Sequence, residues 1–368
     1  MKRLVLVGGG HAHVEVLRRF ARQPERAVEL VLVSPADDTP YSGMLPGLVA
    51  GHYRYGECHL DLRVICVAAR ARFVRTRATA IDPDRRTLVF ASGATMHYDV
   101  ASLDVGSTPP LSAIRGADTV GTPVKPVDAF LAEWSRILDR AGHRAPRIAV
   151  VGTGAGGIEI ALALDHRLRS ASGPSACRLC IVGESPALLP GHAERVRARL
   201  ASILDRRGIE VRTGVGVAEA TGAGLLLDDG SSVDADWIVW ATGAAAPAWL
   251  ASSGLDLDER GFVQVERTLC STSHPAVFAA GDVASVRGTP RPKSGVYAVR
   301  QGPPLAANLR AALRGEALRP FVPQARALSL IGTGGRHAVA SWGELAVEGD
   351  WVWRWKDLID RRFMSRYR

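Results

Sequence analysis

The sequence predicts an α/β fold made of two units in which parallel strands alternate with crossover helices, followed by an α+β tail. Three observations support this prediction. Short apolar runs alternate with helical patterns, a glycine-rich turn follows an apolar run at two places, and 47% of the 368 residues are hydrophobic. A chain of this length suits two or three domains with large cores.

The first glycine-rich turn lies in LVLVGGGHAHVEVL, close to the N-terminus. The apolar and helical spacing around it predicts a strand, a helix and a second strand over 3–8, 11–22 and 27–34. Gly8 and Gly10 match the dinucleotide-binding pattern G-x-G-x-x-G, but His13 occupies the place of its third glycine. Because that glycine mainly sets the distance between helix and strand, we interpret the turn as a variant dinucleotide site.

The second turn, in PRIAVVGTGAGGIEIALAL, has the complete pattern between an expected strand and helix. Gly152 permits the tight turn, Gly154 permits close approach of a pyrophosphate, and Gly157 permits close packing of helix on strand. The start of the helix offers free N–H groups and a positive dipole end to a diphosphate. A further strand is expected over 177–183.

The two histidines of the first turn have other interpretations. His11 and His13 can merely stabilise the bend. A metal site made from both is not expected, because residues i and i+2 do not share a helix face. We therefore expect no metal.

Composition excludes several classes of protein. The net charge is +9, and the basic residues are almost all arginine. These arginines are spread through helical patterns beside acidic residues, so no nucleic-acid partner is expected. The apolar run near the N-terminus ends at Gly8, too early for an export signal, and an odd set of five cysteines fits a reducing cytoplasm. The least charged stretch, 237–255, contains proline and glycine, so no transmembrane helix is expected.

A third segment, AVFAAGDVAS, places Gly281 and Asp282 after a short apolar run. Two dinucleotide turns in one chain are most simply explained by a flavin and a nicotinamide nucleotide. A flavin domain also needs a late acid that reaches the ribityl chain, and Asp282 is suited to that position.

With these pieces in order, the sequence resembles the pyridine nucleotide-disulfide oxidoreductases. Within them it is similar to the branch related to non-proton-pumping NADH:quinone reductases and to flavoprotein domains fused to selenide, water dikinase. The segments that carry the resemblance are GGGHAHVEVL, PYSGMLPGLVAGHY, LDVGSTP, PVKP, GTGAGGIEIALAL and PKSGVYAVRQGPPLAANL.

The resemblance implies two Rossmann-like domains of the glutathione-reductase type. An FAD-binding domain is expected over 1–115 and 258–325, an NAD(P)H-binding domain over 116–257, and a C-terminal segment with an amphipathic helix over 326–368. The implied cofactors are FAD and NAD(P)H. NADH is preferred, because Glu184 stands next to the ribose-reading position and no arginine for a 2′-phosphate is adjacent.

The resemblance also implies the residues that bind the cofactors. They are Gly8, Gly10, His11, Ser34, Ser42, Ala78, Gly106, Gly152, Gly154, Gly157, Glu184, Gly243, Gly281, Asp282, Val296 and Tyr297. Ser34 stands where an acid commonly binds the adenosine ribose. The N–H groups near Val296 and Tyr297 start a helix beneath the flavin, where negative charge arises on reduction.

Three residues are expected to be catalytic: Glu159, Lys293 and Lys125. Glu159 matches a glutamate near the nicotinamide ribose and flavin in related enzymes, and its apolar neighbours favour a buried position. Lys293 would add positive field at the flavin; a solvated loop lysine is the alternative. Lys125, with Tyr41 and Met44, is a candidate on the acceptor side, and a surface lysine beside a packed loop is the alternative.

The cysteines do not predict a redox disulfide. Cys58 and Cys66 are eight residues apart, and Cys177 and Cys180 lie in an expected strand, where side chains three apart point to opposite faces. The expected function is therefore an FAD-dependent NAD(P)H oxidoreductase that passes hydride from NADH to the flavin, which then reduces a quinone-like or other small acceptor directly. Alternatives are a reductase of a selenium or sulfur compound, and a flavin-binding redox sensor or partner-binding module.

The tail, 350–368, predicts an amphipathic helix with one apolar stripe bordered by basic residues, which are Arg354, Lys356, Arg361, Arg362 and Arg366. The stripe consists of Val352, Trp355, Ile359 and Phe363. Tryptophan with arginine suits a helix in a membrane interface, but a helix packed on its own protein or on a second subunit of a homodimer has the same pattern. The expected location is the cytoplasm, including the inner face of the membrane.

Overall fold

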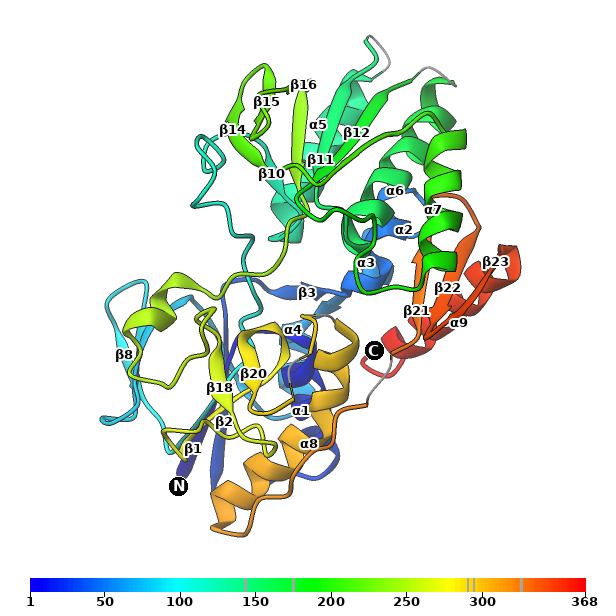
Figure 1. Cartoon of the computed structure of the whole chain (residues 1–368). Helices are drawn as coiled ribbons and strands as arrows, with labels where there is room; N and C mark the ends of the chain where they lie inside the picture. The colour runs from blue at the N-terminus through cyan, green and yellow to red at the C-terminus, as the bar shows by residue number, and fades with distance from the viewer. Residues whose placement is uncertain (142–143, 174–175, 290, 294, 325–326) are drawn as a thin grey trace.

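The computed structural model describes residues 1–368 except 142–143, 174–175, 290, 294 and 325–326. Two five-stranded parallel sheets form its main parts, and a small antiparallel sheet with a helix lies beside the second (Figure 1). The predicted α/β class and the α+β tail are confirmed.

The first sheet has the strand order β19-β9-β1-β2-β5. Its strands are β1 (Lys2–Val7), β2 (Val28–Ser34), β5 (Arg72–Arg75), β9 (Val100–Leu103) and β19 (Val277–Ala279). The central strands β1 and β2 contain the continuous buried apolar runs 4–7 and 30–33, as is typical of a parallel sheet covered by helices. Among these helices, α1 (His11–Arg22) and α8 (Gly295–Arg314) pack against each other.

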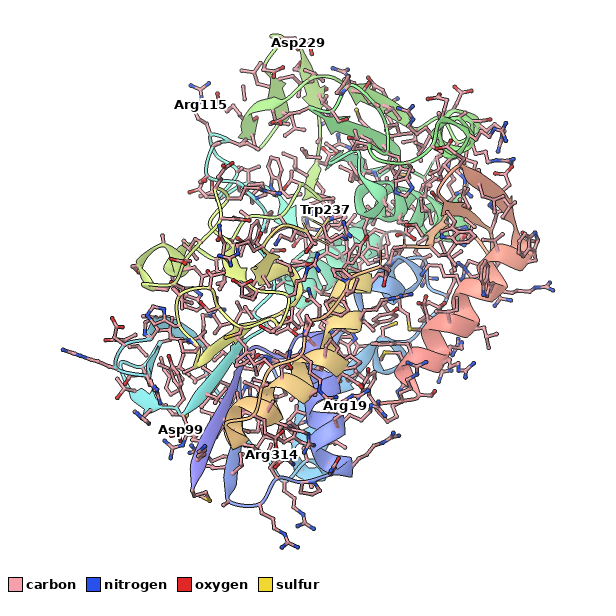
Figure 2. All side chains as sticks on the ribbon, turned by 60° about the horizontal axis from the view of Figure 1, so that its bottom comes forward. Arg19, Asp99, Arg115, Asp229, Trp237 and Arg314 are labelled. Carbon is pink, nitrogen blue, oxygen red and sulfur yellow. The ribbon has the colours of Figure 1, made fainter. Side chains whose placement is uncertain are left out.

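The second sheet has the order β10-β17-β11-β12-β13. Its strands are β10 (Thr122–Pro123), β11 (Arg147–Val151), β12 (Arg178–Gly183), β13 (Glu210–Thr213) and β17 (Trp237–Trp240). Its helices are α5 (Val127–Arg140), α6 (Ala155–Ser172) and α7 (Glu194–Arg206). Trp237, labelled in Figure 2, stacks on Phe130 and Trp134 and so fixes α5 on this sheet.

Smaller elements connect and flank the sheets. Between β2 and β9 along the chain these are β3 (Asp38–Pro40), η1 (Ser42–Met44), α2 (Leu45–Val49), α3 (Tyr55–Cys58), β4 (His59–Asp61), α4 (Leu62–Ala68), β6 (Ala78–Asp82), β7 (Thr87–Phe90) and β8 (Thr95–His97). Of these, α2 packs against α6 beside the second sheet (Figure 1). The later ones are β14 (Val217–Thr221), β15 (Gly224–Leu227), β16 (Ser232–Asp234), η2 (Ala248–Ser252), β18 (Val263–Val265), η3 (Gly281–Val283) and β20 (Ala284–Val286).

The C-terminal segment consists of β21 (Ser329–Gly332), β22 (Ala338–Trp342), β23 (Leu345–Gly349) and α9 (Asp350–Met364). It packs against α6 and α7 (Figure 1). The helix is as predicted, but the four residues of its apolar stripe do not share one environment. Val352 and Phe363 are buried, whereas Trp355 and Ile359 are 40% and 41% exposed. Among the described residues, no helix is both long and apolar enough to cross a membrane.

Candidate functional site

The first glycine turn joins β1 to α1. Gly8 has φ +97°, and a Cβ there would lie 2.3 Å from the carbonyl oxygen of Asp104, so the position needs glycine. His13 is fully buried, with Nδ1 2.7 Å from the Gly8 carbonyl oxygen and Nε2 2.8 Å from Ser102 Oγ. His13 therefore ties the bend to β9, which confirms that this histidine stabilises the turn.

Asp104, directly after β9, is a residue that the motifs did not single out. Its Oδ2 accepts the N–H groups of Ala12 at 2.9 Å and His13 at 3.2 Å, in the first turn of α1. A Cβ on Gly10 would lie 2.2 Å from the Asp104 carboxyl carbon. Burial raises the pKa of Asp104 to about 7. The sequence feature that could have indicated Asp104 is an acidic residue directly after a buried strand, within LDVGSTP.

Several expected cofactor residues gather at this end of α1. Asp282 Oδ2 accepts hydrogen bonds from Lys125 Nζ at 3.0 Å and from Ser107 Oγ at 3.3 Å. Lys125 is thus the partner of the expected ribityl-binding acid. A Cβ on Gly281 would lie 2.3 Å from Asp104 Oδ1, whereas one on Gly106 would meet no atom within 4 Å, so there is open space at Gly106.

One pocket brings together four of the expected residues: Gly281, Asp282, Lys293 and Tyr297. Tyr297 and Val296 lie in the first turn of α8. Lys293 Nζ donates to the Ala284 carbonyl oxygen at 2.6 Å and lies 3.8 Å from the centre of the Phe262 ring. Burial lowers the pKa of Lys293 to about 8. A solvated loop lysine is therefore the wrong interpretation of Lys293.

The remaining expected residues of the first part lie in β2, β6 and η1. Ser34 ends β2, is buried, and lies with its Oγ 3.5 Å from where a Cβ on Gly9 would be. Ala78 begins β6. Ser42 begins η1, and its Oγ would be 3.0 Å from a Cβ on Gly295, so Ser42 faces the start of α8. Met44 is 1% exposed and packs in the core, which favours the packed-loop alternative for this residue.

The second glycine turn joins β11 to α6. Gly152 has φ +138°, and a Cβ there would lie 2.2 Å from the Ala241 carbonyl oxygen. A Cβ on Gly157 would lie 2.0 Å from the carbonyl oxygen of Gly152. A Cβ added to Gly154 or to Gly243 would meet no atom within 4 Å. The backbone is thus tightly packed behind the turn and open in front of it, as a bound diphosphate requires. Glu184 is exposed just after β12.

Glu159 points from α6 toward the C-terminal segment. Its Oε1 accepts the Gly332 N–H at 2.7 Å, and it lines a pocket with Lys356 and Trp353 of α9. Burial raises the pKa of Glu159 to about 6, although Lys356 and the Gly332 N–H act in the opposite direction. A buried carboxyl with this pKa is suited to holding a proton near neutral pH.

Lys356 and Asp360 lie on the buried face of α9. The sequence indicated Lys356 only as a basic residue bordering the apolar stripe, and it did not indicate Asp360. Lys356 Nζ donates to Asp360 Oδ2 at 2.7 Å and to the Gly43 carbonyl oxygen at 2.6 Å. Burial alone would lower the pKa of Lys356, but the carboxylates of Asp360 and Glu159 raise it, so the ammonium stays charged. Their spacing of four residues placed both on one helix face, but nothing in the sequence indicated which face is buried.

An aromatic contact connects this pair to the first glycine turn. The Tyr41 hydroxyl bonds to Asp360, and the Tyr41 ring stacks on Phe363 at 4.4 Å and lies 5.4 Å from the His11 ring. Burial lowers the pKa of His11 to about 4, so its ring is neutral. Among the described residues, His11 Nε2 and Thr242 Oγ1 have no hydrogen-bond partner although both are buried. Such orphaned atoms beside the two turns fit bound ligands.

The five cysteines are free and buried. Burial raises the pKa of each thiol, to about 11 for Cys177 and Cys270 and to about 12 for Cys58, Cys66 and Cys180. Thiols of this kind are poor nucleophiles at neutral pH.

Comparison with known proteins shows the family to which the chain belongs. An NADH dehydrogenase-like protein of Mycobacterium tuberculosis is 30% identical over 302 residues, 78% of this chain and 74% of that protein. A demethylphylloquinone reductase of Synechocystis is 24% identical over 100% of this chain and 92% of that protein. The sulfide:quinone oxidoreductase of Aquifex aeolicus has the same fold, with a TM-score of 0.85 at 18% identity, covering 100% of this chain and 92% of that one. The family model described as pyridine nucleotide-disulphide oxidoreductase matches residues 2–302, and the chain belongs to this family.

Proposed function

We propose that this protein is an FAD-dependent NADH dehydrogenase that reduces a quinone-like acceptor. The observation that carries the proposal is the pair of glycine turns. One joins the central strand β1 of the first sheet to α1, and the other joins the central strand β11 of the second sheet to α6. A buried polar atom without a partner lies beside each turn, His11 Nε2 at the first and Thr242 Oγ1 at the second. Relatives named as an NADH dehydrogenase-like protein and as a demethylphylloquinone reductase support the choice of donor and acceptor.

The chain's residues fit both cofactors. FAD would be held at the first turn by Gly8, Gly10, His11, Ser34, Ser42, Ala78, Gly106, Gly281, Asp282, Val296 and Tyr297. NADH would be held at the second turn by Gly152, Gly154, Gly157, Glu184 and Gly243. The open space at Gly106 and Gly154 and the unpartnered His11 Nε2 support these assignments. The domain limits at 115, 257 and 325 stay predictions.

The chemistry that FAD supplies when bound is hydride acceptance from NADH and electron donation to a second substrate. Lys293 and the first turn of α8 provide positive potential in the pocket that contains Tyr297. Glu159 Oε1 is engaged by the Gly332 N–H, which leaves Oε2 to carry a proton. Reduction of a quinone to a quinol consumes two protons, so we assign Glu159 as a proton donor on the acceptor side, held beside charged Lys356.

The acceptor side faces the C-terminal segment, where α9 presents exposed apolar side chains. These are Trp351, Trp355, Leu358 and Ile359, between 40% and 64% exposed, next to Arg354 and Arg362. This combination suits a helix lying at a membrane surface, from which a lipid-soluble quinone can enter. We therefore propose peripheral contact with the inner face of a membrane through α9.

The test is an anaerobic titration of the purified yellow protein with NADH and, separately, with NADPH, followed by addition of a quinone. The proposal expects one equivalent of NADH to bleach the flavin band and the quinone to restore it. A bound flavin that neither nucleotide bleaches would exclude the dehydrogenase. A flavin that NADH bleaches but no quinone reoxidises would exclude only the acceptor.

A further inference from the structure

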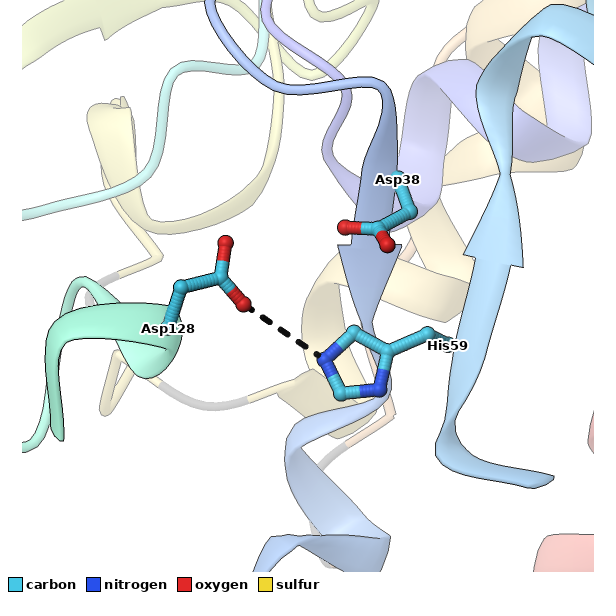
Figure 3. A group of neighbouring side chains, drawn as sticks. All are labelled: Asp38, His59 and Asp128. Atoms are coloured by element: carbon cyan, nitrogen blue, oxygen red, sulfur yellow. Dashed lines mark ion pairs between the residues drawn. The ribbon is translucent and has the colours of Figure 1, made fainter. Parts of the chain in front are cut away.

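Three side chains outside the proposed active site point toward one another between the two parallel sheets. They are Asp38 of β3, His59 of β4 and Asp128 in the first turn of α5 (Figure 3). One nitrogen or oxygen atom from each lies within 4.8 Å of the other two. The proposed electron transfer uses none of the three.

The fold brings them together from both parts of the molecule. β3 and β4 are antiparallel, with Pro40 opposite His59, so Asp38, two residues from Pro40, faces the same side as His59. Asp128 comes from α5, which packs on the second sheet. The cluster therefore spans the junction between the first part and the second.

His59 is the buried member of the cluster, with its side chain only 3% exposed. Its Nδ1 lies 2.9 Å from the Tyr55 carbonyl oxygen, which only accepts, so Nδ1 donates there and Nε2 is the ring nitrogen that faces the carboxylates. Nε2 has no hydrogen-bond partner in the part of the chain that the structure describes. It faces Asp128 Oδ1 at 3.9 Å, too far for a hydrogen bond. A buried ring nitrogen without a partner, facing two carboxylates, is unfavourable without a cation between them.

Over the described residues, no arginine or lysine forms an ion pair with Asp38 or Asp128, although the chain has 46 such residues. Arg63, on the adjoining α4, pairs instead with Asp61 and Asp37.

Tyr55 holds the cluster in place. Its hydroxyl donates to Asp38 Oδ2 at 2.9 Å and lies 3.2 Å from Asp128 Oδ1, and its ring stacks on His59 at 3.6 Å. The three groups are thus fixed before any ion arrives.

We infer that Asp38, His59 and Asp128 bind a divalent transition-metal cation, with Zn²⁺ as the probe of choice. One imidazole and two carboxylates are ligands that zinc accepts, with water completing a tetrahedron. Neighbouring ligand atoms in such a tetrahedron are about 3.4 Å apart, so the 3.9 Å gap closes with a small movement. The contact from Nδ1 to a backbone carbonyl is the outer-shell bond usual for a metal-bound histidine. The ion would fasten α5 to the β3–β4 ribbon and so hold the two parts of the molecule together.

The test uses the FAD-loaded protein without an affinity tag, treated with a chelator and then dialysed against Zn²⁺, with bound metal measured by mass spectrometry. We expect one Zn²⁺ per chain and at least a tenfold loss of affinity in His59→Gln and in Asp128→Asn. His274→Gln is the matched control, since His274 Nε2 faces Asp84 at 3.3 Å elsewhere, and it should leave Zn²⁺ affinity unchanged. Mg²⁺ in excess should not displace Zn²⁺, because it prefers oxygen ligands.

Folding of each variant is checked by flavin content and circular dichroism. Asp128 is 57% exposed, so Asp128→Asn should retain both. As a second readout, one equivalent of Cu²⁺ should show the spin-echo signature of a single imidazole, and His59→Gln should remove it. The inference is overturned if the chain shows no saturable Zn²⁺ binding, or if both variants retain the affinity of the unaltered chain.

Discussion

At the scale of single residues, Glu159 is the carboxyl that we propose donates a proton to the acceptor. Its pKa is raised from 4.5 to about 6, so the proton that it offers is lost as pH rises through that value. We expect kcat with a quinone to fall over the same range. Glu159→Gln should lower that kcat by about 100-fold and remove the dependence. Steady-state kinetics between pH 5 and pH 8 would show this.

The control for Glu159 is the reductive half-reaction, because glutamine still accepts the Gly332 N–H at Oε1. Stopped-flow reduction of the flavin by NADH should change by less than about twofold. Equal losses in both half-reactions would contradict a role in proton donation and indicate a role in binding NADH.

Asp104 predicts a pH dependence of stability. Its pKa is raised from 3.8 to about 7 in the folded protein, which therefore binds more protons than the unfolded chain between these values. The free energy of unfolding consequently falls as pH rises through this window. In Asp104→Asn the free energy of unfolding does not fall in this way, because asparagine does not titrate. The difference in the free energy of unfolding between the variant and the unaltered protein should therefore shift in favour of the variant by up to about 4 kcal/mol from pH 4 to pH 8. Urea unfolding at several pH values measures the difference, and parallel curves would contradict the assignment.

At the scale of elements, the second glycine turn separates packing from binding. A Cβ on Gly157 would lie 2.0 Å from the Gly152 carbonyl oxygen, whereas one on Gly154 would meet open space. Gly157→Ala should destabilise the protein by about 1 to 3 kcal/mol. Gly154→Ala should fold normally and raise KM for NADH about tenfold, because its methyl group fills the space for the diphosphate.

Thermal unfolding and NADH kinetics measure these two effects, with flavin content as the control for the first turn. An unchanged KM in Gly154→Ala would count against NADH at this turn. An unchanged melting temperature in Gly157→Ala would mean that the helix can move away from β11.

At the scale of the whole molecule, the exposed apolar side chains of α9 predict membrane contact. Replacing Trp351, Trp355 and Leu358 with serine should reduce cosedimentation with anionic lipid vesicles by about tenfold. Activity with a soluble acceptor should not change, because these side chains point away from the core. Val64→Ser with Val67→Ser, 62% and 78% exposed on α4, is the matched control.

A homodimer is the competing explanation for the same surface, and sedimentation in solution distinguishes the two. If the α9 variant changes the mass of the particle without changing vesicle binding, the surface is a subunit contact and the membrane proposal fails.

The sequence by itself determined the fold class and both glycine turns, because a strand, a turn and a helix within about 20 residues are encoded locally. At Gly8 and Gly152, positive φ and close backbone contact leave glycine as the residue that fits. The late Gly281 and Asp282 were found in the same way, and the structure brings them to the first turn.

Only the tertiary structure decided which distant segments meet. Glu159 faces Lys356, Asp128 faces His59, and Asp104 caps α1, each across a long stretch of chain. On α9 the sequence pattern left open whether the apolar stripe faces a membrane or the protein, and the structure buries Lys356 and Asp360 beside it, where they neutralise each other four residues apart. Local patterns fix elements, but the partners of a buried charge depend on packing that no short segment encodes.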